Sequence, residues 1–81
     1  MPSDVPKEHL SRFFYIRGIL RGNLRDSPGA AQDLETAVSV WPAPSNQAFK
    51  ALQDHYRETG DEAAAAAVEE RVKQLKRPRG R

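Results

Sequence analysis

Cysteine is absent from this chain of 81 residues. Its absence excludes disulfide bonds, thiolate nucleophiles and cysteine-ligated zinc sites. The chain also lacks any run of about 18 apolar residues and has no apolar stretch near its N-terminus, so neither a membrane-spanning helix nor a secretory signal peptide is predicted. We therefore expect a soluble, cytoplasmic protein without membrane association.

Motifs of enzyme chemistry are equally scarce. The two histidines, His9 and His55, have carboxylates beside them in the sequence but do not show the spacing of a metal site. The sequence contains no nucleophile motif, no phosphate-binding glycine loop and no cofactor fingerprint. We therefore expect a protein that is not an enzyme and that holds neither a cofactor nor a metal ion.

Large apolar side chains are few. Hydrophobic residues make up 38% of the chain, but many of them are alanine, including the run 63–67. A chain of this length forms one small domain, and so light a core supplies only about 3–5 kcal/mol of stability. Self-association or a bound partner would add to that.

Charge is unevenly distributed around a net value of +2. Residues 1–25 hold five basic and two acidic groups, residues 26–70 hold two basic and nine acidic groups, and residues 71–81 hold six basic groups and no acidic one. An acidic middle between basic ends favours compaction or head-to-tail contacts between copies. The field at a distance stays weak, because the opposing charges lie close together.

Apolar residues recur at helical spacing in four segments, and no segment shows the alternation typical of a strand. The predicted helices span about residues 6–21, 28–40, 46–59 and 62–76. We expect an all-α fold in which residues 6–76 form one domain. Residues 1–5 are expected to be frayed, and residues 77–81 to form a basic, disordered tail.

The last two helices are predicted to form an antiparallel hairpin around Gly60 and Asp61. Gly60 supplies the left-handed residue that ends one helix, and Asp61 caps the next. A weaker copy lies upstream, where Ser27 is the expected cap and Pro42 ends the second helix. Ser45 is the expected cap of the third helix. Two antiparallel hairpins follow from this pattern.

The second hairpin resembles the tetratricopeptide repeat (TPR) family, whose units are 34-residue helix–turn–helix repeats. Taking Asn46 as the first residue of a repeat, Phe49, Leu52, Tyr56 and Ala65 stand where the family has a large residue, leucine, tyrosine and alanine. Gln53 and Val72 depart from the family, which has a small residue and alanine there. The resemblance covers residues 10–75 and implies two stacked hairpins in a right-handed arrangement.

Two registers fit the first helix of the upstream copy. One places Phe14, Arg17, Gly18 and Arg21 at the inner positions of the repeat. The other is shifted by one residue and places Phe13, Ile16 and Leu20 there, with an extra residue in the following turn. We prefer the second register, because two unpaired buried guanidinium groups would cost far more than a longer loop. It turns an apolar face toward the core, formed by Leu10, Phe13, Ile16, Leu20 and Leu24.

The resemblance implies a concave groove between the first and third helices, in which such proteins hold an extended peptide or a partner helix. The residues expected to line it are Arg12, Tyr15, Ile19, Lys50, Asp54 and Arg57. We therefore predict an adaptor that binds a protein or peptide. Two repeats fall short of the three or more that usually make a stable solenoid, so we also expect a homo-oligomer or a part of a larger assembly.

An alternative function is a small, basic, nucleic-acid-associated helical protein. Arg17, Arg21 and Arg25 repeat every four residues, and Arg77 and Arg79 lie in the basic tail. No aromatic residue is interleaved in the tail for base stacking. Nucleic acid is therefore the less favoured partner, and the arginine stripe is interpreted first as a solvated face that answers nearby acidic helices.

Overall fold

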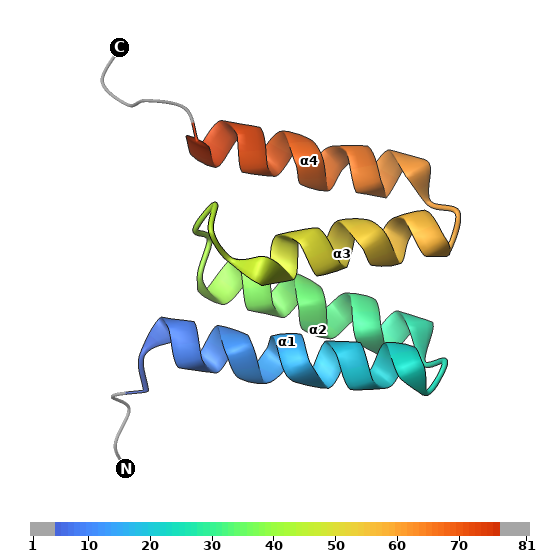
Figure 1. Ribbon diagram of the computed structural model, residues 1–81, viewed down its shortest axis with the longest axis horizontal. Helices are drawn as coiled ribbons and strands as arrows, with labels where there is room; N and C mark the ends of the chain where they lie inside the picture. The colour runs from blue at the N-terminus through green and yellow to red at the C-terminus, as the bar shows by residue number, and fades with distance from the viewer. Residues whose placement is uncertain (1–4, 77–81) are drawn as a thin grey trace.

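The computed structural model describes residues 5–76, which form four helices joined by short turns (Figure 1). They are α1 (Lys7–Asn23), α2 (Ser27–Val40), α3 (Gln47–Glu58) and α4 (Glu62–Lys76). No strand occurs within residues 5–76, which confirms the predicted all-α class. Fraying was expected for residues 1–5, of which 1–4 lie outside the described part, as does the disordered tail expected for residues 77–81.

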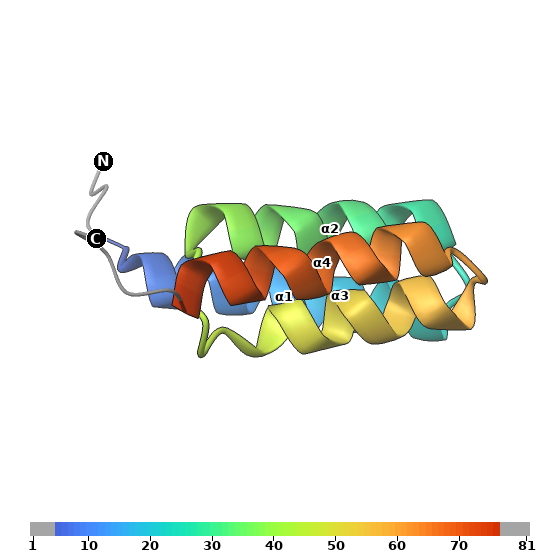
Figure 2. The ribbon, with the colours of Figure 1, turned by 90° about the horizontal axis from the view of Figure 1, so that it is seen from above.

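The helices pair as two antiparallel hairpins, α1–α2 and α3–α4, and α3 packs against both helices of the first hairpin. Figure 2 shows the four helix axes running side by side when the molecule is seen from above. None of the helices described between residues 5 and 76 is long and apolar enough to cross a membrane.

The N-terminal caps of α2 and α3 lie one residue away from their predicted positions. Asp26, not Ser27, caps α2, with its Oδ1 accepting from the amide of Gly29 at 3.2 Å. Asn46, not Ser45, caps α3. Asp61 caps α4 as predicted, since its Oδ1 accepts from the amide of Ala64 at 3.1 Å.

The two hairpins repeat the same turn at a displacement of 35 residues, which separates Arg25 from Gly60 and Asp26 from Asp61. Asp26 and Asp61 are equivalent caps, and each donates its own amide to a carbonyl five residues earlier at 2.8 Å. The residue before each cap has a positive φ, which is 66° at Arg25 and 82° at Gly60. The turn of the first hairpin therefore contains no extra residue.

The preferred register of α1 was wrong. Phe13, Ile16 and Leu20 are 52%, 46% and 56% exposed, whereas Gly18 is buried and Phe14 packs against the core. The other register holds, because the inward-facing guanidinium groups are not unpaired.

The partner of both arginines is Asp33 on α2, which is buried. Arg17 donates from Nε to Oδ2 at 2.8 Å and from Nη2 to Oδ1 at 3.0 Å. Arg21 reaches the same carboxylate at 3.6 Å. Because Asp33 pairs with both guanidinium groups, their inward orientation does not carry the desolvation cost of an unpaired charge. That cost was the reason for preferring the shifted register.

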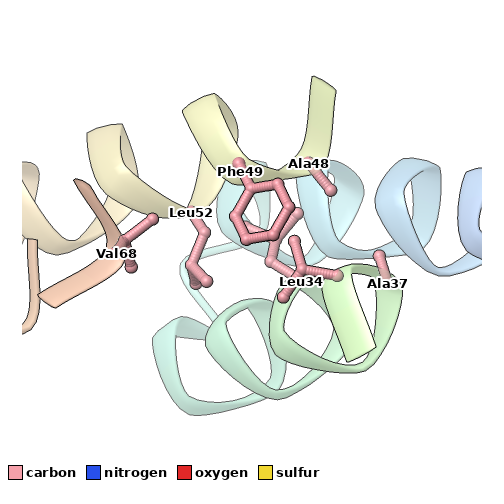
Figure 3. Close-up of a cluster of buried hydrophobic side chains, with 7 residues drawn as sticks. Leu34, Ala37, Ala48, Phe49, Leu52 and Val68 are labelled. Carbon is pink, nitrogen blue, oxygen red and sulfur yellow. The ribbon is translucent and has the colours of Figure 1, made fainter. Parts of the chain in front are cut away.

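The core lies where the two hairpins meet. Figure 3 shows Leu34 and Ala37 of α2, Ala48, Phe49 and Leu52 of α3, and Val68 of α4 gathered in one cluster, which also includes Val38. Gly18 lets α1 approach α2 closely, because a Cβ there would lie 2.9 Å from Cγ of Leu34.

Polar contacts join the hairpins beside this core. The side-chain amide of Asn46 donates to Oγ of Ser11 at 3.0 Å and to the carbonyl of Trp41 at 2.8 Å. Glu35 of α2 accepts from the Tyr56 hydroxyl at 2.8 Å and from Arg71 at 3.0 Å. These bonds fix α3 and α4 relative to α2.

Candidate functional site

A hollow of about 750 Å³ opens between α1 and α3. Its α1 wall is formed by small, aromatic and aliphatic residues, namely Tyr15, Gly18, Ile19 and Gly22. Its α3 wall is mainly polar and consists of Gln47, Lys50, Ala51, Asp54, His55 and Glu58. Leu34 of α2 also lines it, and the turn residues Asn23, Arg25, Ser27 and Thr59 close one end. The hollow therefore combines an apolar wall with a charged one.

Four of the six residues expected to line the groove do so: Tyr15, Ile19, Lys50 and Asp54. Arg12 and Arg57 are exposed and are not among the lining residues. Arg12 precedes Ile19 by seven residues, and Arg57 follows Lys50 by seven, so on an ideal helix each lies only about 20° around from that groove residue but about two turns further along the axis. The structure brings the other four together from two helices that are far apart in the sequence.

Arg25 and His55 also line the hollow, although the sequence named Arg25 only as a possible basic contact and did not place His55 there. Arg25 leaves α1 because its positive φ belongs to the turn, and a guanidinium at this place could not be foreseen from a helical stripe. His55 follows Ala51 by four residues on α3, so helical spacing places it on the same face as that lining residue.

The charged groups of the α3 wall are only loosely held. Lys50 and Asp54 approach to 3.7 Å as an i, i+4 pair, and both side chains are largely exposed. Such a surface pair contributes at most about 1 kcal/mol. Lys50 and Asp54 can therefore exchange their mutual contact for contacts with charged or polar groups of a ligand.

The hollow also brings a hydroxyl near an imidazole ring. Ser27 and His55 approach to 3.4 Å between Oγ and Nε2, which is longer than the hydrogen bond through which a base activates a nucleophile. Within residues 5–76, no cluster of three or more histidine, cysteine, aspartate and glutamate side chains could hold a metal ion. The arrangement suits hydrogen bonds, ion pairs and apolar packing with a bound chain.

The candidate basic contact does not form one exposed stripe. Arg17 and Arg21 turn toward Asp33, and Arg17 also lies over the rings of Phe13 and Phe14 at 5.3 and 5.5 Å. The hydrogen bond from Arg17 lowers the pKa of Asp33, and the same bond raises the pKa of Arg17. Arg25 lies apart in the turn. Arg77 and Arg79 fall outside the described residues.

Tyr56 also lies on α3, but it contacts Glu35 of α2 and does not line the hollow. Burial raises the pKa of Tyr56 to about 12, and its hydrogen bond to Glu35 acts in the same direction. Arg71 completes the group, since its guanidinium lies 5.8 Å from the centre of the Phe49 ring. The neutral phenol is the form that this environment favours at physiological pH.

No family model matches the chain, and neither the curated proteins nor the solved structures contain a significant match to it. Any proposal about function must therefore start from the hollow between α1 and α3 and from the repeated hairpin.

Proposed function

We propose that this chain is a non-enzymatic interaction module that holds a peptide or helix of another protein between α1 and α3. The observation that carries the proposal is the two-walled hollow of about 750 Å³. A peptide can pack apolar side chains against Tyr15 and Ile19 while its polar groups meet Lys50 and Asp54. Pockets that combine an apolar lining with a few convergent polar groups are typical of binding sites.

The repeated hairpin supports a TPR-like assignment. The two copies share a cap, a positive-φ turn residue and a 35-residue displacement. In the second copy Phe49 and Leu52 are buried and Gly60 forms the turn, which is the layout that the resemblance implies. Helical repeats of this kind usually present extended concave binding surfaces. We include homo-oligomerisation in the proposal, because two repeats provide few buried apolar side chains.

A displayed library of random 12-residue peptides, selected on the wild-type chain, tests the proposal. The selected peptides should bind with a micromolar Kd in fluorescence anisotropy, and Ile19→Asp should weaken them at least tenfold by placing a charge in the apolar wall. Leu20→Asp is the matched control, because it makes the same change at the adjacent residue, which does not line the hollow.

Circular dichroism must first show that both variants keep the helical content of the wild type. Selected peptides that bind Ile19→Asp as tightly as the wild-type chain would contradict the proposal. So would a selection that enriches no peptide.

A further inference from the structure

An apolar stripe lies on the exposed side of α1, and no other helix within residues 5–76 covers it. Its members are Leu10, Phe13, Ile16, Leu20 and Leu24, which recur every three or four residues and are between 40% and 78% exposed. We call this surface the outer α1 stripe. Contiguous exposed apolar surface on a small protein commonly marks an interaction site.

The internal repeat shows what kind of surface the stripe is. With the 35-residue displacement, Phe13, Ile16 and Leu20 correspond to Ala48, Ala51 and His55 on α3. Ala48 is fully buried in the cluster with α2, Ala51 packs against that cluster, and His55 approaches Ser27 of α2. The outer α1 stripe therefore occupies the positions through which the second hairpin packs on the first.

The far end of the molecule does not offer a matching surface. Leu34 and Val38 of α2 lie in the core cluster with residues of α3, and their counterparts on α4 are Glu69 and Lys73. Both counterparts are exposed. Stacking one copy head-to-tail on another would strip water from these charges without pairing them, which is costly.

The outer α1 stripe instead matches itself when it is reversed. If two α1 helices run antiparallel and cross near Ile16, Leu10 of one copy lies opposite Leu24 of the other, and Phe13 lies opposite Leu20. Self-complementarity of this kind is what a two-fold interface requires. Beside the stripe, Asp33 already neutralises Arg17.

We infer that a second copy of this chain covers the outer α1 stripe through antiparallel α1–α1 packing around a two-fold axis near Ile16. The 17 residues of α1 extend about 25 Å, so the contact buries roughly 1,000 Å² in total, at the low end for a specific interface. Such a dimer should have a Kd in the micromolar range. It does not depend on the groove that was proposed to bind a peptide.

Sedimentation equilibrium from 5 µM to 1 mM (~200-fold in concentration) tests the dimer, since this range brackets a micromolar Kd. The wild-type chain should be dimeric at the upper end. Leu20→Asp should raise the Kd roughly 100-fold or more, because each dimer contains the changed residue twice. Ile19→Asp, the adjacent residue on the groove side, should leave the Kd within about threefold. Phe13→Ser replaces Leu20→Asp if that variant loses its helical signal.

A wild-type chain that stays monomeric at 1 mM would overturn the inference and leave the stripe to a helix of another protein. Equal effects of Leu20→Asp and Ile19→Asp would also overturn it. Peptide binding that persists in Leu20→Asp separates this result from the groove proposal, because the groove does not need the dimer.

The direction of packing has its own test. Because the chain has no cysteine, Asn23→Cys gives a single site for a nitroxide spin label at the exposed end of α1. Antiparallel packing around Ile16 places the two labelled backbones about 20 Å apart, whereas parallel packing places them about 10 Å apart. A pulsed dipolar measurement that finds only the shorter separation would overturn the antiparallel arrangement.

Discussion

Arg17 and Leu52 occupy equivalent places in the two hairpins, 35 residues apart, yet they hold their hairpins together by different physics. Leu52 is fully buried in a cluster that includes Val68 of α4. Arg17 instead forms a bidentate ion pair with Asp33, the counterpart of Val68 on α2. One repeat position can therefore hold an apolar or a charged residue, provided that the position facing it changes too.

The difference between the ion pair and the apolar contact also changes which side chains are exposed. Because Arg17 and Arg21 face α2, the bulky residues beside them, Phe13 and Leu20, face outward. The second hairpin has Ala48 and His55 at those two places; Ala48 is buried against the first hairpin, and the partly buried His55 approaches Ser27. The same helix face is thus an exposed surface on α1 and part of the contact between the hairpins on α3.

The largest effect is expected from Leu52→Ala. Removing this fully buried side chain should lower the free energy of unfolding by about 2–5 kcal/mol, a large share of the stability of so small a domain. Arg17→Ala, at the equivalent place, should lower it less, because Arg17 is 42% exposed. Thermal melts followed by circular dichroism measure both. A Leu52→Ala variant that melts at the wild-type temperature would contradict the larger contribution to stability that is expected of Leu52.

Gly18→Ala should come next. The added Cβ would lie 2.9 Å from Cγ of Leu34 and 3.3 Å from the carbonyl oxygen of Ala30, so overpacking should cost about 1–3 kcal/mol. Its counterpart Gln53 is only partly buried, and Gln53→Ala should stay within about 0.5 kcal/mol of the wild type. Urea titrations of both variants compare the two helix contacts. If Gly18→Ala gains stability, as alanine does in an open helix, then α1 and α2 are not closely packed.

The ion pair can be converted into the apolar contact of the second hairpin. Asp33→Val alone should cost roughly 1–2 kcal/mol, because Arg17 loses its bonded partner and water screens what remains. Arg17→Leu alone should also destabilise, because it weakens the pairing of a buried carboxylate. The double variant should regain stability or exceed the wild type. A double-mutant cycle in urea measures the coupling energy between positions 17 and 33. If the losses of the two single variants simply add in the double variant, the expected coupling is contradicted.

The same pair should shape acid unfolding. The pKa of Asp33 is lower in the folded chain than in the unfolded one, so its contribution is present above the unfolded value of about 3.9 and is lost as the pH falls through the folded value. The double variant should lack this part of the acid transition, which a comparison of unfolding curves at pH 7 with curves at successively lower pH below about 3.9 can measure.

Tyr56 follows Leu52 by four residues, and its counterpart in the first hairpin is Arg21. Tyr56→Phe should cost about 1 kcal/mol at neutral pH by removing the bond to Glu35. The folded pKa of Tyr56 is raised to about 12, so its contribution is complete below the unfolded pKa of about 10 and is lost as the pH rises toward the folded value. The wild-type chain should therefore lose more stability than Tyr56→Phe over that alkaline range. Parallel losses in the two chains would contradict this.

The smallest effects are expected in the turns. Gly60 has a φ of 82°, and a Cβ there would touch nothing, so Gly60→Ala should cost about 1 kcal/mol for backbone conformation alone. Arg25→Gly, at the equivalent place, should gain up to about 1 kcal/mol, because arginine already bears that strain. A melting temperature that falls in Gly60→Ala and rises in Arg25→Gly would support the equivalence of the two turns. Changes of the same sign in the two variants would contradict it.

Local patterns were enough to predict the four helices, the turn at Gly60 and the burial of Leu52. Periodicity, caps and glycine act over a few residues, so the sequence displays them directly. The caps Asp26 and Asn46 were missed by one residue, because several neighbouring polar residues can cap equally well.

The register of α1 could not be predicted in the same way. It depends on Asp33, which lies 16 residues beyond Arg17 on another helix, and no local pattern reveals that pairing. For the groove, the resemblance to tetratricopeptide repeats named Tyr15, Ile19, Lys50 and Asp54, but it did not place Arg25 there, whose position follows from a left-handed turn. Tertiary contacts decided what periodicity alone left open.

Asn46 gives the linker between the hairpins a second role. Its side-chain oxygen accepts from the amide of Ala48, while its nitrogen serves Ser11 and the carbonyls of Ala37 and Trp41. Separating the hairpins would deprive this amide of its partners on α1 and at the C-terminal end of α2, namely Ser11 and the carbonyls of Ala37 and Trp41. The molecule should thus behave as one cooperative block, and not as two modules that can be cut apart and exchanged.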